Sequence, residues 1–403
     1  MTPASYASPQ DEAHEQGPCR RGPALLRAAA IILATIAALK LGTEFHRLVL
    51  DPGVLGAIDL KMRHQEIQGW FSGDPLYETV QTAVYPPASH AILWPLLGWL
   101  TWPQARWLWA AVTLVLLGWL VRLVVREAGA RSRIERLLAA LMLLSMNASG
   151  VCIGNGQLSL AILPLIVAAV LLLHRSPASF RTDLAAAALV LVSLVKPSLT
   201  APFFWLVWLM PGRLRPAILV AAGYVALTLI AGAFQEARLL ELLRGWAQVS
   251  QVDCPSCGSA DLHMLLSALG LEAWTFPASL LMLLALGAWI VLHRRVDIWV
   301  LLGVTALAAR FWTYHGTYDD VMVVLPMVAL FRAARTDRHA AVLLAVGIPA
   351  MLLPVRLHHF WPAPWPLLFA VVHAATWLGM LVFLLRQARR EVRVKTVPAA
   401  SGL

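Results

Sequence analysis

Acidic side chains are concentrated in one early stretch of an otherwise apolar chain. Between residues 43 and 85 lie six of them: Glu44, Asp51, Asp59, Glu66, Asp74 and Glu78. A carboxylate can accept the proton of a hydroxyl nucleophile, so each is a candidate general base, although each can also be a solvated charge. Asp59 is preferred because it lies in the apolar stretch 53–60, where partial dehydration raises the basicity of a carboxylate. Glu66 and Glu78 remain competitors, and Asp74 precedes a proline in a turn-forming sequence.

Further polar groups interrupt the apolar sequence downstream. Asn155 and Gln157 flank a glycine and can form a polar turn between helices or hold the hydroxyls of a ligand. Lys196 precedes a proline, and it can be a snorkelling amine at a helix end or a cation for a phosphate at the membrane surface. A last cluster combines a cation, an imidazole and two carboxylates: Arg310, His315, Asp319 and Asp320. Such a set can bind an anionic leaving group, or it can anchor the chain at the interface with its aromatic neighbours.

No metal or other cofactor is expected at these residues. The spacing of His315, Asp319 and Asp320 is not a known ligand signature. Cys254 and Cys257 have the spacing of a redox or zinc motif. However, the sequence around them predicts a membrane-protein loop and not a βαβ unit, and a second Cys pair is absent. A local disulfide is therefore the preferred interpretation of this pair.

The elements that must position these residues are membrane helices. Of 403 residues, 59% are hydrophobic and 13% are charged, against roughly 25% charged in soluble domains. This composition excludes a soluble globular fold. A span needs roughly 20 apolar residues, and twelve runs reach or approach that length, at about 24–42, 104–125, 137–151, 158–173, 184–195, 198–211, 216–234, 275–292, 298–310, 321–331, 340–354 and 364–385.

The basic residues predict how these runs are oriented. The net charge of +10 arises from short clusters between apolar runs, which is typical of membrane topology and not of nucleic-acid binding. Twelve crossings with both termini cytoplasmic place 22 of the 32 Lys and Arg on the inner side. The proline-containing run 86–101 would break this pattern as a crossing, so it is interpreted as re-entrant. Every unusual polar cluster then faces the outer side.

The polar motifs, taken in order, resemble those of glycosyltransferase family 87, in the GT-C superfamily. The resemblance is carried by Asp59 in a long first outer loop, by the string from Gly73 to Tyr77, and by Tyr85-Pro86-Pro87. The turn Asn155-Gly156-Gln157, the string Val195-Lys196-Pro197 and the late polar segment around His315 and Asp319 continue it. The resemblance implies a sugar donor linked to a polyprenyl phosphate, an acceptor hydroxyl and one carboxylate acting as base.

These observations together predict an all-α polytopic membrane protein with about 12 transmembrane helices, a re-entrant segment and a long first outer loop. The expected regions are a disordered N-terminus (1–23), a GT-C membrane domain (24–386) with outer loops at 43–85 and 235–274, and a basic cytoplasmic tail (387–403).

The predicted function is an inverting hexosyltransferase of the cytoplasmic membrane, with mannose as the first candidate sugar and a glycan or glycolipid as acceptor. Asp59 is the predicted base. Lys196, Arg310, His315, Gln157 and Asn155 would bind the donor, and the supporting residues would be Tyr77, Tyr85, Asp319 and Asp320. The alternatives are a lipid or glycan transporter, in which loss of Asp59 is tolerated, and a structural membrane subunit. A transporter is less favoured because few ionisable residues lie within the predicted helices and no internal repeat is evident.

Overall fold

The fold is all-helical across the residues that the structure describes. The computed structural model describes residues 21–250, 261–353 and 365–396, and no strand occurs among them. The α-helices, in chain order, are α1 (Arg21–Val49), α2 (Ile58–Ser72), α3 (Leu76–Thr79), α4 (Pro87–Leu97), α5 (Trp102–Glu127), α6 (Arg133–Ser145), α7 (Asn147–Asn155), α8 (Leu158–Arg175), α9 (Phe180–Ser193), α10 (Pro197–Trp208), α11 (Leu214–Gly232), α12 (Leu239–Val249), α13 (Leu262–Ala268), α14 (Thr275–His293), α15 (Ile298–Phe311), α16 (Val324–Ala333), α17 (Arg338–Leu352) and α18 (Trp365–Thr396). Two 3₁₀ helices, η2 (Glu272–Trp274) and η3 (Thr317–Val323), complete the described part.

Six helical segments within the described ranges are long and apolar enough to cross a membrane. They are Ala24–Val49, Trp102–Glu127, Leu158–Arg175, Leu214–Gly232, Glu272–His293 and Val371–Val394. The pair α6 and α7, bent by 50°, would make a seventh. The prediction of about twelve transmembrane helices is not confirmed, because α9, α10, α15, α16 and α17 have only 10 to 15 residues. Helices enclosed by other helices do not have to match the thickness of the lipid.

Helices extend into three segments that the sequence analysis treats as loops or as a tail. The first outer segment, 43–85, is largely helical and not a loop: α1 continues to Val49, and α2 and α3 follow it. Charged side chains in the last turns of α1 pair with one another and with backbone oxygens, so they do not end the helix where the apolar run stops. Likewise, the described part of 235–274 contains α12 and α13, and α18 extends to Thr396 into the predicted tail. Most of the predicted disordered N-terminus and the Cys254–Cys257 pair lie outside the described residues.

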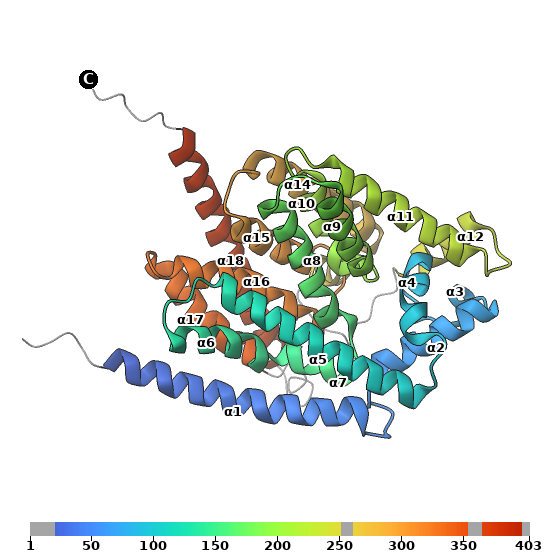
Figure 1. Cartoon of the computed structure of the whole chain (residues 1–403), viewed down its shortest axis with the longest axis horizontal. Coiled ribbons are helices and arrows are strands. Elements are labelled where there is room, and N and C mark those ends of the chain that lie inside the picture. The colour runs from blue at the N-terminus through green and yellow to red at the C-terminus, as the bar shows by residue number, and fades with distance from the viewer. Residues whose placement is uncertain (1–20, 251–260, 354–364, 397–403) are drawn as a thin grey trace, which may run out of the picture.

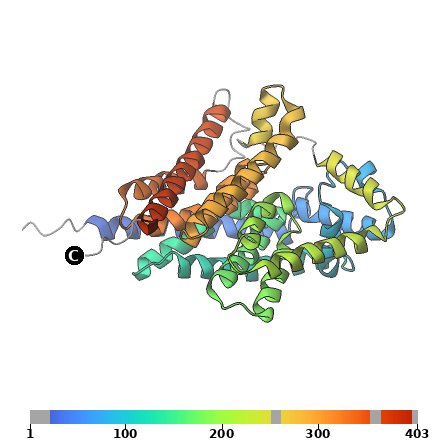
Figure 2. The same ribbon diagram turned by 90° about the horizontal axis from the view of Figure 1, so that it is seen from above.

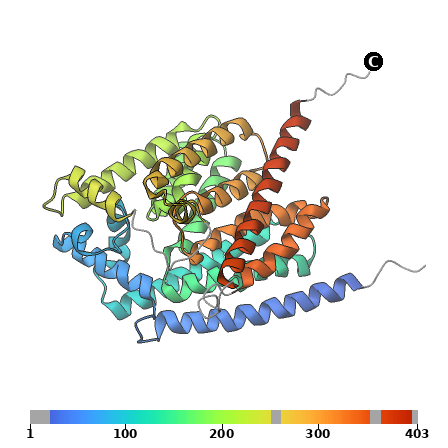
Figure 3. The ribbon, with the colours of Figure 1, turned by 180° about the vertical axis from the view of Figure 1, so that it is seen from behind.

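The helices are arranged in a bundle with two distinct ends. Figure 1 shows α1 running along one edge beneath α5, α6 and α7, with α2, α3, α4 and α12 gathered beyond its C-terminal end. Seen from above, α16, α17 and α18 lie at the other end of the molecule (Figure 2). The view from behind shows the same separation, with α18 crossing the bundle near α17 (Figure 3). The run 86–101 contains α4, whose 11 residues are too few for a crossing.

Ion pairs at one end of the bundle join segments that are distant in sequence. The carboxylate of Glu127, at the end of α5, pairs with Arg175 at the end of α8 and accepts from Trp299 Nε1 at 3.1 Å. Arg332 donates to the backbone oxygen of Glu127 at 3.0 Å and pairs with Asp297 at 3.1 Å. The charge pattern assigns the segments of Glu127, Arg175, Asp297 and Arg332 to the inner side, and Trp299 lies at the start of the adjacent apolar run. The structure thus places these segments together, as a common membrane face requires.

At the opposite end of the bundle, side chains of neighbouring helices hold the segment that follows the C-terminus of α1. Arg106 of α5 donates to three backbone oxygens there, among them those of Leu48 at 2.6 Å and Asp51 at 2.7 Å. These bonds satisfy carbonyls that a helix C-terminus leaves without partners. The chain then turns into α2 through Ala57, which has a left-handed φ of 52° and donates its N–H to the backbone oxygen of Gly154 at 3.1 Å. The start of α2 is therefore fixed against α7.

Candidate active site

Asp59 lies in the first turn of α2, where the turn after α1 delivers it to the middle of the polar end. Its side chain is hydrogen-bonded to the amides of Asn155 and Gln157. Burial raises the pKa of this carboxyl, while the two amides and the charges of Arg63 and Lys196 act in the opposite direction. Its Oδ2 atom is buried and has no hydrogen-bond partner among the described residues. Asp59 is thus a carboxylate held by two amides, and one of its oxygens makes no hydrogen bond to the described residues.

The turn between α7 and α8 brings both amides to this carboxylate. Gly156 has a φ of 71°, which is the left-handed region that favours glycine. A Cβ at this position would lie 2.5 Å from the Cβ of Leu60, one residue beyond Asp59. Only a glycine lets the turn approach α2 so closely. Asn155 and Gln157 therefore form a polar turn, as one of the two sequence interpretations holds, and their amides face Asp59.

Lys196 is buried at the start of α10 and is not placed as a snorkelling amine. Its Nζ atom lies 2.6 Å from Asp319 Oδ1 and donates to Ser159 Oγ at 2.9 Å. Ser159 also donates to Asp319, closing a triangle of three polar groups. The amine lies 4.7 Å from the centre of the Tyr318 ring, a favourable place for a cation. The structure thus joins α8, α10 and η3 through one buried charge pair.

The imidazole of His315 is neutral at pH 7, whereas the carboxylate of Asp319 is ionised. Burial lowers the pKa of His315 to about 4, with Asp319 opposing this effect, so the ring is neutral at pH 7. Its Nδ1 atom lies 2.7 Å from the backbone oxygen of Thr313, to which a neutral ring donates. Burial alone would raise the pKa of Asp319, but the charge of Lys196 and its hydrogen bond lower it. His315 therefore brings a neutral donor and acceptor, and not a standing positive charge, to the site.

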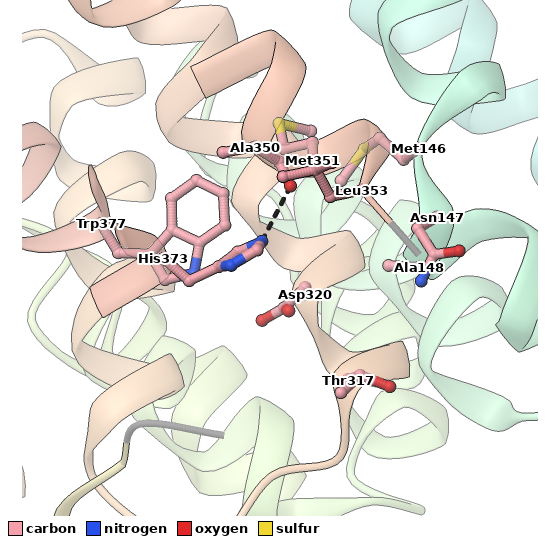
Figure 4. Close-up of a pocket in the computed structure, with 10 residues that line it drawn as sticks. All are labelled: Met146, Asn147, Ala148, Thr317, Asp320, Ala350, Met351, Leu353, His373 and Trp377. Atoms are coloured by element: carbon pink, nitrogen blue, oxygen red, sulfur yellow. Dashed lines mark hydrogen bonds between the residues drawn. The ribbon is translucent and has the colours of Figure 1, made fainter. Parts of the chain in front are cut away.

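Arg310 supplies the second cation of this end. It is buried and ion-paired through Nε with Asp320, and its Nη1 atom has no hydrogen-bond partner among the described residues. Asp320 borders a small pocket between η3, the start of α7, the end of α17 and α18 (Figure 4). Thr317, His373 and Trp377 also line it. The two adjacent carboxylates of η3 therefore have different surroundings. Asp319 pairs with Lys196, and Asp320 borders this pocket.

A third ion pair involves Arg63, one turn after Asp59 on α2. Its Nη1 atom lies 2.7 Å from Glu66 Oε2, and its guanidinium lies 4.3 Å from the centre of the Tyr85 ring. Tyr77 donates to the backbone oxygen of Tyr85 at 2.7 Å, so both tyrosines predicted as supporting residues belong to this corner. Burial raises the pKa of Glu66 to about 7, while Arg63 opposes the increase. Glu66, the competing base, is therefore committed to a buried pair.

The structure brings the predicted residues of α2, the α7–α8 turn, α10 and η3 to one region. Four contributors were not predicted: Arg47 of α1, which donates to Asn155, together with Arg63, Ser159 and Tyr318. Arg63 could have been found from the sequence, because residues 59 and 63 lie on the same face of a helix that starts near Asp59. Among the described residues, no three His, Cys, Asp or Glu side chains are grouped to hold a metal ion.

This fold and this site define the class of protein: a helical membrane protein whose carboxylate, amides and cations converge at one end of the bundle. The model of glycosyltransferase family 87 matches residues 83–354, and the chain belongs to this family. It is therefore a membrane glycosyltransferase. The match includes the α7–α8 turn, Lys196 and the residues from Arg310 to Asp320, whereas Asp59 precedes it. No curated protein and no solved structure matches the chain.

Proposed function

We propose that this glycosyltransferase moves a hexose, with mannose as the first candidate, from a polyprenyl phosphate to a glycan or glycolipid acceptor. The reaction takes place at the outer side of the cytoplasmic membrane, with both termini on the inner side. The observation that carries this proposal is Asp59, held by two amides with one buried oxygen lacking a partner, and close enough to Lys196 to interact electrostatically. A base next to a cationic region suits a neutral hydroxyl nucleophile and an anionic leaving group.

In the proposed mechanism Asp59 Oδ2 accepts the proton of the acceptor hydroxyl as its oxygen bonds to the anomeric carbon of the donor. The bond from that carbon to the phosphate oxygen breaks on the opposite face, and the electron pair leaves with the polyprenyl phosphate. The configuration of the anomeric carbon is thereby inverted. A phosphate is a good leaving group, so a second carboxylate acting as general acid, as in a glycosidase, is unnecessary.

The leaving phosphate is proposed to lie near Lys196, Arg310 and His315. Lys196 and Arg310 are fixed by their ion pairs before any substrate arrives, and preorganised cations stabilise negative charge that develops during a reaction. Neutral His315 can contribute a hydrogen bond. The amides of Asn155 and Gln157 would reach the sugar as well as Asp59, and Tyr77 and Tyr85 would support the corner beside α2. These donor-binding roles remain predictions.

The test is transfer by the purified protein from a panel of radiolabelled polyprenyl-phosphate sugars. Asp59→Asn keeps the shape of the side chain and removes the proton acceptor, so the transfer rate should fall roughly 100- to 10,000-fold. Donor binding should be retained. Glu78→Gln is the matched control, because Glu78 is an exposed acid of the same segment. Transfer by the Asn variant at the wild-type rate would remove Asp59 from the mechanism, and binding without turnover by the wild type would favour a transporter.

A further inference from the structure

The last turns of α1 carry an ion-paired stripe directed at α7. Glu44 and Arg47 pair at 3.1 Å, and Lys40 donates to the backbone oxygen of Ser145 at 3.0 Å. Ionisable residues within a predicted span are costly unless they serve a partner. Lys40 and Glu44 have evident structural partners within the bundle. Arg47 differs from them because its partner, Asn155, contacts the candidate base.

The contact between Arg47 and Asn155 determines which way the amide points. Arg47 Nη2 donates to the side-chain oxygen of Asn155. A guanidinium has donors only, and an ionised carboxylate has acceptors only. The amide oxygen must therefore face Arg47, and the amide NH₂ must face Asp59, to which Asn155 is hydrogen-bonded. The chain Arg47, Asn155, Asp59 is consistent in only one orientation of the amide.

The close approach of α1 to α7 is built into the sequence. A Cβ at Gly150 would lie 2.6 Å from Lys40 Cγ, and one at Gly154 would lie 2.5 Å from Arg47 Nε. Glycines four residues apart thus give α7 a face without side chains, against which the long side chains of α1 lie. The arrangement brings a guanidinium from outside the main polar cluster to the amide at the end of α7.

We propose that Arg47 is a positioning residue for sugar transfer: it orients the amide of Asn155, which in turn holds the Asp59 carboxylate and leaves Oδ2 to the acceptor hydroxyl. This inference rests on the proposed role of Asp59 as base. Without the guanidinium, the amide can turn its oxygen toward the carboxylate, and the two oxygens repel each other. The carboxylate then loses its fixed direction, and small displacements of a reacting group reduce rates strongly.

The experiment is a double-mutant cycle on Arg47→Met and Asn155→Ala, with kcat and the donor KM measured for each variant. Each single change should lower kcat roughly 10- to 100-fold, and Arg47→Met, whose side chain is not proposed to touch the donor, should leave the donor KM nearly unchanged. If Arg47 acts through Asn155, adding Arg47→Met to Asn155→Ala should cause little further loss. Arg47→Gln has no fixed donor direction and should resemble Arg47→Met, so it takes the place of that variant if the latter does not fold.

Lys40→Met is the matched control, since it removes a neighbouring charge of α1 that does not contact Asn155. It should lower the thermal midpoint without lowering kcat. Additive losses in the cycle, or an equal loss of kcat in Lys40→Met, would mean that Arg47 only anchors α1, and the inference would be overturned. Asp59→Asn belongs in the same series. A fully active Asp59→Asn variant would refute the proposed base. An inactive Asp59→Asn variant together with a fully active Arg47→Met variant would refute only the positioning role of Arg47.

Discussion

Replacing Lys196 with Met should have two separable effects, because the amine is both buried and ion-paired. The substitution keeps the apolar stem and leaves Asp319 as a buried carboxylate without its cation. Breaking a buried pair from one side costs about 3–5 kcal/mol, since the remaining charge is no longer compensated. The single variant is therefore expected to be destabilised, and its activity alone says little about donor binding.

The double variant Lys196→Met, Asp319→Asn separates charge loss from instability. Neutralising both partners of a buried pair is often nearly neutral for stability, so the double variant should recover most of the lost free energy of unfolding. Transfer should stay low nevertheless, because the proposed cation for the phosphate is still missing. The donor KM should rise, or kcat should fall, in both variants.

The assay combines thermal unfolding in detergent with transfer kinetics for a polyprenyl-phosphate sugar. Arg213→Met with Asp183→Asn is a matched control, because that pair is also buried and is made of residues that the charge pattern assigns to the inner side. Because Arg215 also lies 3.5 Å from Asp183, the single Arg213→Met variant should lose less stability than Lys196→Met, and neither control variant should have a selective effect on the donor. Wild-type kinetics in the Lys196→Met, Asp319→Asn variant would show that the amine is only structural and would refute its role at the phosphate.

Two further predictions concern the supports of Asp59. Gly156→Ala places a Cβ against Leu60 at a φ of 71°, so it should destabilise the protein by about 1 kcal/mol or more and reduce transfer; an unchanged thermal midpoint would contradict this. Glu66 has a pKa raised by burial from 4.5 to about 7, so its contribution to stability is largest below pH 4.5 and is lost as the pH rises through 7, by about 3 kcal/mol. Glu66→Gln should lack this decline between pH 5 and pH 8, and equal pH dependence of unfolding in both proteins would exclude Glu66 as its source.

The sequence predicted the helical class and the approximate position of the six long apolar helices in the described part of the chain, since apolar runs are visible in the sequence itself. It did not predict helix lengths where charges continue a helix. The last turns of α1, after Leu41, contain Glu44 and Arg47, and their mutual pairing and the contact with Asn155 are tertiary facts. The count of about twelve crossings is not confirmed for a related reason, because short buried helices such as α16 are as apolar in sequence as helices that are long enough to span.

For the site, sequence reasoning selected polar groups that the structure brings together, but it did not predict how they are paired. Residue type and isolation among apolar neighbours selected Lys196 and Asp319 separately, but no spacing rule connects two positions 123 residues apart. The left-handed Gly156 could be anticipated from a glycine between two amides, whereas its contact with Leu60 depends on the turn that follows α1. Contacts between distant segments are what the sequence alone leaves open.

The pairing of charges also explains why one carboxylate among several suits the role of base. Within the described part of the chain, three buried cations near the site already have an anionic partner: Lys196 with Asp319, Arg310 with Asp320 and Arg63 with Glu66. Before substrate binds, pairing reduces the free-energy cost of burying these charges. The cations are then in place for a phosphate that competes with those carboxylates. Asp59 has amide partners instead of an ion pair among these residues, so its proton affinity is raised by burial without being cancelled by a bound cation. A carboxylate in this state can accept a proton from an acceptor hydroxyl without first breaking a salt bridge.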